Sequence, residues 1–439
     1  MFGVEMDSGA PPKAADAVVI GGGIIGCSTG YYLAKRGLKV VLCEKGRIAG
    51  EQSSRNWGFV RQQGRDPREM PMIMNSLSLW RGLEAELDDD LGWHQGGVLY
   101  LGAGDKDMQA YEDWLEIARR HGLDSRLLSA AEVGNRLGLN SHHWAGGLET
   151  PSDGRAEPFK AAPAIARGLE RLGGTVVTGC AVRGIETAGG RVMGVVTEKG
   201  PVRARRVVCA AGAWSSYFNG NFGRGFPQLK VRTSVARTSP APAFTERAVW
   251  ADEVSFRRRQ DGGFTISGGN VIDAELVPDS FRYFNAFRPL MKMSWRDLRL
   301  RMGARSWYEL RRPRHWGLDE VSPFERLRVL DPAPDNRRLD RLLDNAKRLY
   351  PALRDCELVE RWAGLIDVTP DAIPVMDAAT GTEGYFIATG FSGHGFGIGP
   401  GAGHAMAGLV AEGDAGLDLS PFRLSRFFDG TKLEPFDQI

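Results

Sequence analysis

The sequence lacks an apolar run that could cross a membrane, because no stretch reaches about 20 consecutive apolar residues. Cysteine is scarce: the five cysteines are widely spaced and form no C-x-x-C pair. We therefore expect buried free thiols in a reducing compartment rather than a disulfide framework. Residues 1–15 are polar and contain Pro11-Pro12 without an apolar core, so we expect no signal peptide. These absences predict a cytoplasmic protein.

The sequence also lacks an excess of charge of either sign. Lys and Arg number 56 against 54 Asp and Glu, a net charge of +2, which gives no reason to expect a nucleic-acid partner. His142 and His143 form no metal-ligand spacing with any Cys, Asp or Glu, so we expect no metal site. With 439 residues, 42% of them hydrophobic, the chain is long enough for two domains.

Glycine and apolar residues occur in an informative order near the N-terminus. Residues 17–45 read as a strand, a glycine turn, a helix and a second strand that ends on Glu44. Gly21, Gly23 and Gly26 have the dinucleotide-binding spacing, in which glycine permits a tight turn, close approach of a pyrophosphate and close helix–strand packing. The pyrophosphate would lie on free N–H groups at the helix start, and Glu44 would bind a ribose hydroxyl. This unit predicts dinucleotide binding.

The rest of the chain alternates between helical and strand-like patterns. We expect helices at 71–87, within 105–137 and at 159–172, and strands at 93–102, 175–177, 181–186, 191–198 and 202–211. Residues 231–272 are again strand-like, and residues 384–413 read as a strand, a glycine-rich loop and a helix with Pro400 in its first turn. Because strands that suit the first unit return after residues 175 and 384, we expect a discontinuous nucleotide domain.

Several motifs carry a resemblance to a known family. Beside the N-terminal unit, they are EQSSRNWG at 51–58, CAAGAWS at 209–215, RWAG at 361–364 with TPDAIP at 369–374, and GFSGHGFG at 390–397. Together they resemble the flavin-dependent amine and amino-acid oxidoreductases that include glycine oxidase, sarcosine oxidase and D-amino-acid dehydrogenase. The resemblance implies an α/β fold in which a Rossmann-like FAD-binding domain is interleaved with a mixed-sheet (α+β) substrate domain.

The resemblance also implies FAD as the cofactor, whereas the glycine spacing alone indicates only a dinucleotide. We expect the FAD-binding domain at 14–88, 145–225 and 338–439, and the substrate domain at 89–144 and 226–337. A helix start after residue 393 would stabilise negative charge at the pyrimidine end of the flavin. Ala363-Gly364 stand where some members have a cysteine joined to the flavin, so we expect non-covalent binding. The expected cofactor contacts are Gly21, Gly23, Ile24, Ile25, Gly26, Glu44, Lys45, Ser53, Ser54, Arg55, Asn56, Trp57, Gly58, Val182, Ala211, Gly212, Trp214, Gly364, Gly393, His394, Gly395, Phe396 and Gly397.

Arg61, Arg65 and His394 are the candidate catalytic residues. The resemblance places Arg61 where the family has an arginine close to the flavin, and Arg65 follows on the same loop. Either arginine could bind a substrate carboxylate, because its guanidinium is bidentate; a surface or structural ion pair is the alternative. His394 lies in a glycine loop with little to pack on, so it either lies at the flavin or caps the nearby helix. Trp57 either packs on the flavin ring or belongs to the core.

Two departures from the sarcosine-oxidase pattern bear on the chemistry. Gly397 follows Phe396 where similar members carry a carboxylate-binding lysine, and we expect it to leave space for a substrate larger than glycine. The stretch GFTIS at 263–267 resembles the strand that presents an oxygen-activating lysine, but it contains no lysine. A flavin without that positive charge should react poorly with oxygen, which favours a dehydrogenase over an oxidase.

A basic segment follows in the second half of the chain. Residues 282–314 hold ten basic residues against Asp297 and Glu309. Apolar residues recur through it at helical spacing and predict an amphipathic helix: Phe287, Met291, Trp295, Leu298 and Met302. The segment either lies peripherally on an anionic membrane at its inner face, or packs on its own domain or a partner subunit, the interpretation that we favour.

We therefore expect an FAD-dependent oxidoreductase that oxidises the CH–NH bond of an amino acid or N-substituted amino acid. The substrate would be a secondary amine or a D-amino acid, oxidised to an imine by hydride transfer to the flavin. The alternatives are an amine oxidase that produces hydrogen peroxide and a non-catalytic flavoprotein subunit of an electron-transfer complex. The expected partners are the small-molecule substrate and an electron acceptor, which is oxygen, a quinone or an electron-transfer protein.

Overall fold

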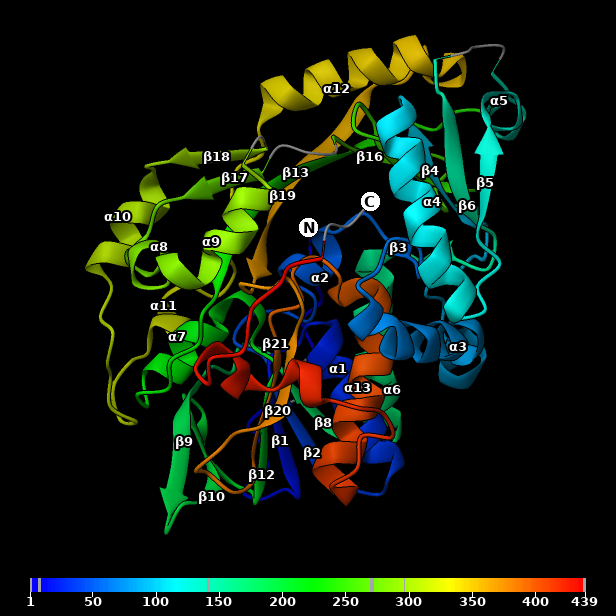
Figure 1. The fold of residues 1–439 in the computed structure, drawn as a ribbon. Helices are drawn as coiled ribbons and strands as arrows, with labels where there is room; N and C mark the ends of the chain where they lie inside the picture. Colours follow the sequence, from blue (N-terminus) through cyan, green and yellow to red (C-terminus); the bar gives the residue numbers. More distant parts are fainter. Residues whose placement is uncertain (1, 7–8, 140–142, 269–271, 296, 437–439) are drawn as a thin grey trace.

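Two large β-sheets organise the chain (Figure 1). The computed structural model describes residues 2–6, 9–139, 143–268, 272–295 and 297–436. The first sheet has the order β20-β21-β12-β1-β2-β8, in which β20 joins antiparallel and the other strands run parallel. Its strands are β1 (Ala17–Ile20), β2 (Val40–Cys43), β8 (Thr175–Val177), β12 (Arg206–Cys209), β20 (Val375–Ala378) and β21 (Tyr385–Thr389).

Both faces of this sheet are covered, which explains why its strands are continuous apolar runs. Ala17 and Val19 pack into a cluster with four helices, while Val18 and Ile20 point to the opposite face, as the two-residue period of a strand requires. The helices are α1 (Ile24–Lys35), α3 (Met70–Leu87), α6 (Pro158–Arg171) and α13 (Gly395–Glu412). The opposite face carries a three-stranded antiparallel sheet of β9 (Val182–Ala188), β10 (Arg191–Thr197) and β11 (Gly200–Arg203) (Figure 1).

The second sheet has ten strands in the order β18-β17-β13-β16-β15-β14-β4-β6-β5, with β19 paired to β13. Leu99 and Leu101 face a cluster with α5 and α12, whereas Val98 and Tyr100 face α4 on the other side. Its strands are β4 (Val98–Gly102), β5 (Arg126–Ser129), β6 (Gly146–Thr150), β13 (Leu229–Thr238), β14 (Ala248–Trp250), β15 (Ser255–Arg258), β16 (Phe264–Ser267), β17 (Ile272–Glu275), β18 (Leu298–Arg301) and β19 (Leu358–Val368). The helices are α4 (Asp105–Arg120), α5 (Ala130–Leu137) and α12 (Asn336–Leu349).

Short elements connect the two sheets. They are α2 (Gln52–Arg55), β3 (Phe59–Val60), the 3-10 turn Pro67–Glu69, β7 (Gly154–Arg155), α7 (Ser215–Gly220), α8 (Pro278–Arg282), α9 (Phe284–Met293), α10 (Ala304–Arg311) and α11 (Pro323–Arg326). β6, β19 and most of α12 fall in ranges that the sequence assigns to the FAD-binding domain, yet the two strands belong to the second sheet and the helix packs on it. The chain therefore passes between the two layers repeatedly (Figure 1).

The structure confirms most of the expected elements. The helices expected at 71–87 and 159–172 are α3 and α6, and the strands expected at 175–177, 181–186 and 191–198 are β8, β9 and β10. The single strand expected at 202–211 is wrong, because β11 pairs with β10 and β12 pairs with β1 in another sheet. Pro400 also lies inside α13 rather than in its first turn, because the helix already begins at Gly395.

The basic segment is not one helix. α8, α9 and α10 are separate, and between α9 and α10 the chain forms β18, which pairs in parallel with β17. The helical spacing of Leu298 and Met302 is therefore misleading, because backbone pairing at the sheet edge decides the conformation of Leu298 in β18, and Met302 follows the end of that strand. Large apolar side chains of the segment are exposed, including Trp295 at 67%, Met302 at 63% and Leu310 at 62%.

Candidate active site

The glycine turn after β1 is built for close approach of the backbone. Gly21 has a φ of +110°, and a Cβ on it would lie 2.4 Å from the carbonyl oxygen of Ala210. A Cβ on Gly26 would lie 1.9 Å from the carbonyl oxygen of Gly21. Because no side chain fits at either position, the turn, the start of α1 and the end of β12 come together. This is the arrangement that a dinucleotide pyrophosphate requires.

Glu44 follows β2, as the sequence predicts. Its carboxylate accepts hydrogen bonds from the backbone amides of Gly22 and Gly46, each at 2.7 Å, and burial raises its pKa against the opposing charge of Lys45. A cavity of about 120 Å³ opens beside it, between the glycine turn and the end of β12. The expected cofactor residues that line this cavity are Gly21, Gly23, Glu44, Lys45, Ser53, Val182, Ala211, Gly212 and Trp214.

Two carboxylates of this cavity region were missed by sequence reasoning. Asp367 on β19 accepts hydrogen bonds from the Gly390 amide at 2.9 Å and from Gln228 Nε2 at 3.1 Å, and burial raises its pKa. Glu51 is 2.6 Å from Lys45 Nζ and accepts from Trp214 Nε1 at 3.0 Å. For Asp367 a signal was available in the sequence: it is a carboxylate within the apolar run of residues 363–368, and a buried charge is stable only when other groups bind it.

A second cavity, of about 1190 Å³, lies between the first unit and the larger sheet, and Gln52 lines both cavities. The expected residues that line it are Asn56, Trp57, Gly58, Arg61, Arg65, Gly393, His394, Phe396 and Gly397. Seven expected residues line neither cavity: Ile24, Ile25, Gly26, Ser54, Arg55, Gly364 and Gly395. Arg55 contacts Asp331 and the Ala363 carbonyl instead, and its side chain is 1% exposed.

Arg61 and Arg65 form the polar inner end of the large cavity. Arg61 lies over the Tyr100 ring, 5.6 Å from its centroid, and donates to the Gln63 carbonyl. Arg65 is 3% exposed, donates from Nε to the Arg61 carbonyl at 3.2 Å, and has an unpaired buried Nη1. Burial and the neighbouring Arg61 lower the pKa of Arg65 to about 10. Two guanidinium groups at one end of a cavity create a site for an anion.

Asp153 holds the loop that carries these arginines. It accepts from the backbone amides of Gln62 at 2.8 Å and Gln63 at 3.1 Å, and burial raises its pKa to about 6. The carboxylate therefore orders the backbone between Arg61 and Arg65 while adding negative charge behind them. Sequence reasoning gave no indication of it, because residue 153 comes close to this loop only in the folded chain.

His394 lies where α13 begins. Its ring is buried and lines the large cavity, and its Nδ1 is 2.9 Å from Oε2 of Glu69, a residue that sequence reasoning missed. Glu69 is 0% exposed and ends the 3-10 turn before α3. Burial lowers the pKa of His394, and Glu69 opposes that shift. The structure thus brings together Arg61, Arg65 and His394, and adds Glu69 and Asp153 to them.

Gly397 has a different role from the expected one. A Cβ there would lie 3.2 Å from both the Phe59 carbonyl oxygen and the Val60 Cα. The expectation that Gly397 leaves open space is therefore wrong, because the backbone of β3 occupies it. The Gly397 carbonyl also accepts from Ser76 Oγ at 2.7 Å and Trp80 Nε1 at 2.9 Å. The glycine allows α13 to pack directly against β3, which brings His394 close to Arg61.

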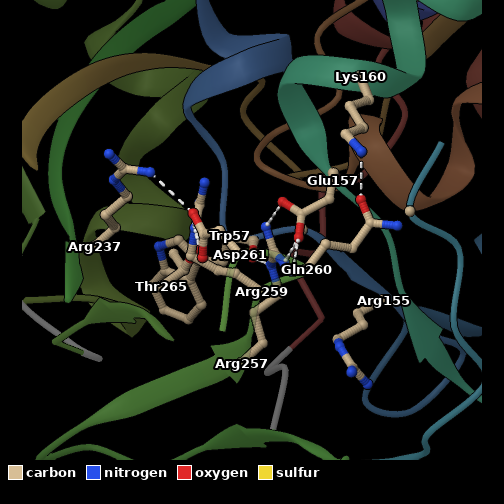
Figure 2. A network of polar contacts seen from close by, with 12 residues as sticks. Trp57, Arg155, Glu157, Lys160, Arg237, Arg257, Arg259, Gln260, Asp261 and Thr265 are labelled. Carbon is tan, nitrogen blue, oxygen red and sulfur yellow. Dashed lines mark hydrogen bonds and ion pairs between the residues drawn. The ribbon is translucent and has the colours of Figure 1, made fainter. Parts of the chain in front are cut away.

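A buried polar network fixes the loop at residues 56–58 (Figure 2). Arg257 on β15 donates both Nη atoms to Glu157, each at 2.9 Å, and its Nε to the Trp57 carbonyl. Gly58 follows with a φ of +85°, and a Cβ on it would lie 2.4 Å from Arg257 Nε. The network therefore ties the loop to the larger sheet and to the start of α6. Trp57 itself lines the large cavity and contacts the Phe59 ring edge-on.

Away from the two arginines the large cavity has an extensive apolar lining, with charged residues such as Lys106, Asp107 and Glu253 among it. α8 and α9 supply much of it, opposite aromatic residues of the larger sheet and α4. The apolar lining includes Tyr111, Trp144, Trp250, Phe281, Phe284, Phe287, Leu290, Met291 and Leu298. A substrate with a bulky apolar side chain would bury that side chain here, because such contacts remove apolar surface from water.

Metal and membrane motifs are not found in the described residues. Within these ranges, no group of three or more His, Cys, Asp or Glu is arranged to hold a metal ion; His142 lies outside them. None of the helices in the described part of the chain combines the length and the apolar character that a bilayer span needs.

Comparisons with known proteins agree with the geometry. The family model described as DAO, FAD dependent oxidoreductase, matches residues 16–409. The structure is similar to that of L-amino acid deaminase from Proteus myxofaciens in complex with anthranilate, with 32% identity and a TM-score of 0.92, over 97% of this chain and 96% of that one.

Curated relatives are more distant in sequence. Sarcosine oxidase subunit beta of Rhizobium meliloti is 25% identical over 428 residues, which cover 96% of this chain and 90% of that protein. Human mitochondrial sarcosine dehydrogenase is also 25% identical over 428 residues, which cover 95% of this chain but 42% of that protein. The chain thus spans less than half of the length of the mitochondrial enzyme that it matches.

Proposed function

We propose, on the premise that this chain belongs to the DAO family of FAD-dependent oxidoreductases, that it oxidises the CH–NH bond of an amino acid or an N-substituted amino acid to an imine. One observation carries the proposal: the smaller cavity beside the glycine turn and the large cavity that contains Arg61 and Arg65 are both lined by Gln52. Within the described residues, no carboxylate forms an ion pair with Arg61 or Arg65. An amino acid would supply the missing carboxylate.

The residues present fit FAD. The glycine turn and the start of α1 would hold the pyrophosphate, Glu44 the ribose, and Asp367 with the end of β12 the chain of hydroxyls that follows. When bound, the flavin supplies a hydride acceptor for the carbon next to the amine. The N-terminus of α13 offers free N–H groups and the positive end of the helix dipole to negative charge near His394. Ala363 and Gly364 cannot form a thioether, and we propose that FAD binds non-covalently.

The substrate is an amino acid with a bulky apolar side chain. Its carboxylate would bind Arg61 and Arg65, and its side chain would extend toward Trp250 and Phe287 in the outer cavity. Holding the carboxylate at one end and the side chain at the other fixes the orientation of the Cα–H bond, which lowers the entropic cost of the reaction. A secondary amine or a D-amino acid of this size is the substrate class that we propose.

We favour a dehydrogenase over an oxidase. β16 presents Thr265 and Ser267 where a lysine would activate oxygen, and Thr265 is engaged with Arg259. Lys230 lines the large cavity, but its ammonium is 3.1 Å from Glu309, a carboxylate that Arg305 and Arg312 also contact, and burial lowers the pKa of Lys230 to about 8. A reduced flavin at this site would therefore pass its electrons to a quinone or an electron-transfer protein faster than to oxygen.

Anaerobic mixing tests the proposal. Purified holoprotein is mixed with a panel of D-, L- and N-alkyl amino acids of increasing side-chain size, and the flavin absorbance near 450 nm is followed. We expect bleaching with bulky apolar members and little with glycine. Reoxidation by an artificial dye should be much faster than by air. Absence of bleaching across the panel would contradict the proposal and would favour the non-catalytic flavoprotein subunit.

The exposed apolar side chains of the basic segment 282–314 change the interpretation that we favour from the sequence, and we further propose that this segment contacts the anionic inner face of a membrane. Trp295, Met302, Trp307 and Leu310 are more than half exposed on a segment rich in arginine. This combination suits a membrane interface, because apolar side chains enter the acyl boundary while cations remain at the headgroups. The protein would then be cytoplasmic with a peripheral contact, close to a quinone pool.

Vesicle binding tests the membrane contact. We expect the holoprotein to sediment with vesicles that contain phosphatidylglycerol and not with pure phosphatidylcholine. The double variant W295S/W307S should lose this binding, while F428S, which removes a side chain of similar exposure elsewhere, should retain it. If neither vesicle binds and W295S/W307S instead disrupts an oligomer in light scattering, the segment is a subunit contact.

A further inference from the structure

His394 and Glu69 form a buried pair at the inner end of the large cavity. The side chain of His394 is 7% exposed and that of Glu69 is 0% exposed, and Nδ1 lies 2.9 Å from Oε2. Among the described residues, the Glu69 side chain forms its ion pair with His394 Nδ1, and no aligned hydrogen bond reaches either of its oxygens. A carboxylate buried this completely is costly unless it compensates a positive charge. The pair is therefore suited to an imidazole that becomes charged.

The two edges of the imidazole ring face different surroundings. Nδ1 faces Glu69 away from the cavity, whereas His394 itself lines the cavity together with Arg61 and Arg65. In the described part of the chain, no protein group bonds to Nε2. With Glu69 on Nδ1, the lone pair of a neutral ring lies on Nε2, the edge that is open to a ligand.

Burial and the two arginines near the ring disfavour its charged form in the free protein. Burial lowers the pKa of His394, Glu69 raises it, and Arg65 and Arg61 lower it further. Asp153 lies behind the two arginines, and the Asp66–Arg68 pair on the turn before Glu69 is internally balanced. The first turn of α13 adds no acidic residue. An incoming substrate carboxylate would offset the two arginines, and the ring could then accept a proton.

We propose that His394 removes a proton from the ammonium group of the substrate, with Glu69 as the positioning residue that stabilises the imidazolium. The proposal rests on the amine oxidation proposed above. In this step, one N–H bond of the substrate breaks, its electron pair stays on nitrogen, and the proton forms an Nε2–H bond. The product is a neutral amine, which can release a hydride from its carbon; an ammonium group cannot, because its nitrogen has no lone pair to form the imine.

The pH dependence of flavin reduction provides the test. An alkylammonium with the pKa of a lysine side chain, near 10.4, is neutral in roughly one molecule of 2,500 at pH 7. We expect H394N to reduce flavin about 10²- to 10³-fold more slowly than the wild type at pH 7. The rate should rise about tenfold per pH unit and approach the wild-type rate near pH 10, where the substrate is neutral without help. Asparagine is a favourable N-cap, so α13 should still begin normally.

Two further variants separate chemistry from structure. E69Q should lower the rate at pH 7 by about tenfold and be rescued by high pH, whereas E69D should retain more activity. H404N changes a histidine on the same helix that packs on Tyr32, and it should leave the pH profile unchanged. An H394N rate that is as far below the wild-type rate at pH 10 as at pH 7, or that equals the wild-type rate at pH 7, would overturn the proposal; the comparison with wild type is needed because the pKa of Arg65 is also about 10.

Ligand binding gives a readout apart from turnover. α-Methylphenylalanine has an ammonium group but no Cα–H bond, and (methylthio)acetate has a carboxylate but no amine. In H394N, α-methylphenylalanine should bind at least tenfold more tightly at pH 9.5 than at pH 7, while the wild-type Kd should change little. (Methylthio)acetate should bind both proteins equally. If none of the amino acids in the panel bleaches the flavin of the wild-type protein, the proposed function itself is refuted. If the wild type is bleached but the pH dependence of flavin reduction is the same in H394N, only the role of His394 is refuted.

Discussion

Replacing Arg257 by methionine should destabilise the protein strongly, because it leaves Glu157 as a buried, unpaired carboxylate. The side chains of Arg257 and Glu157 are 1% and 2% exposed, and the guanidinium binds the carboxylate through two bonds of 2.9 Å (Figure 2). Breaking such a pair costs about 3–5 kcal/mol. For 439 residues, the entropy of unfolding is about 0.9 kcal/mol per °C. The expected fall in Tm of R257M is therefore about 3–5 °C.

A double-mutant cycle separates the pair from its neighbours. E157M should lower Tm by a similar amount, because it strands a buried guanidinium. The double variant R257M/E157M removes both charges of the pair and loses mainly the bonds to the Trp57 carbonyl and the Gln260 amide. Its Tm should therefore fall about as far as that of one single variant, and not by the sum of both.

Thermal unfolding is followed by circular dichroism at saturating FAD, so that differences in cofactor occupancy do not enter the comparison. Arg237→Met is the control: it breaks the Arg237–Asp261 pair in the same network (Figure 2) and the Arg237–Glu360 pair, where the side chains are 35%, 41% and 38% exposed. Each such pair contributes about 0–1 kcal/mol, so their loss lowers Tm by about 2 °C at most. Additive effects of R257M and E157M, or a fall in R257M no larger than in R237M, would refute the reasoning.

Three further predictions follow from the site. Gly26→Ala should yield colourless protein that does not retain FAD, and the flavin absorbance of the purified protein measures this. The control is Gly82→Ala, where a Cβ meets nothing within 4 Å; it should keep FAD and raise the free energy of unfolding by about 0.5–1 kcal/mol. Arg65→Met should lower kcat/KM for a free amino acid about 10- to 150-fold, from the loss of a charged hydrogen bond, and much less for its amide; equal losses for both would count against carboxylate binding. Burial raises the pKa of Asp153 to about 6 from 3.8, so the folded state binds this proton more tightly and stability rises as pH falls through 6. The wild type should gain about 1 kcal/mol relative to D153N between pH 7 and pH 5, visible as a difference of about 1 °C in Tm, and a change of opposite sign would contradict this assignment.

The local features of the chain could be predicted from the sequence. Residues 17–45 formed the expected strand, turn, helix and strand, because apolar runs, glycine spacing and a terminal carboxylate act over short distances. α3 and α6 were equally clear from their apolar period. Arg61, Arg65 and His394 were also expected from the sequence as site residues, and all three line the large cavity. That expectation rested on the family resemblance as well as on the chemistry of the residue types.

The tertiary structure decided what depends on contacts between distant segments. Glu69 and Asp153 could not be predicted from the sequence as members of the site, because each contacts residues that are distant in the chain: Glu69 contacts His394, and Asp153 contacts the loop that carries Arg61 and Arg65. β18 interrupts a helical apolar period because an open sheet edge supplies backbone partners, and Gly397 accommodates β3 rather than a ligand. Short-range sterics and polarity set the elements from the sequence alone, whereas burial, charge compensation and the free space around each group exist only once the two sheets are packed together.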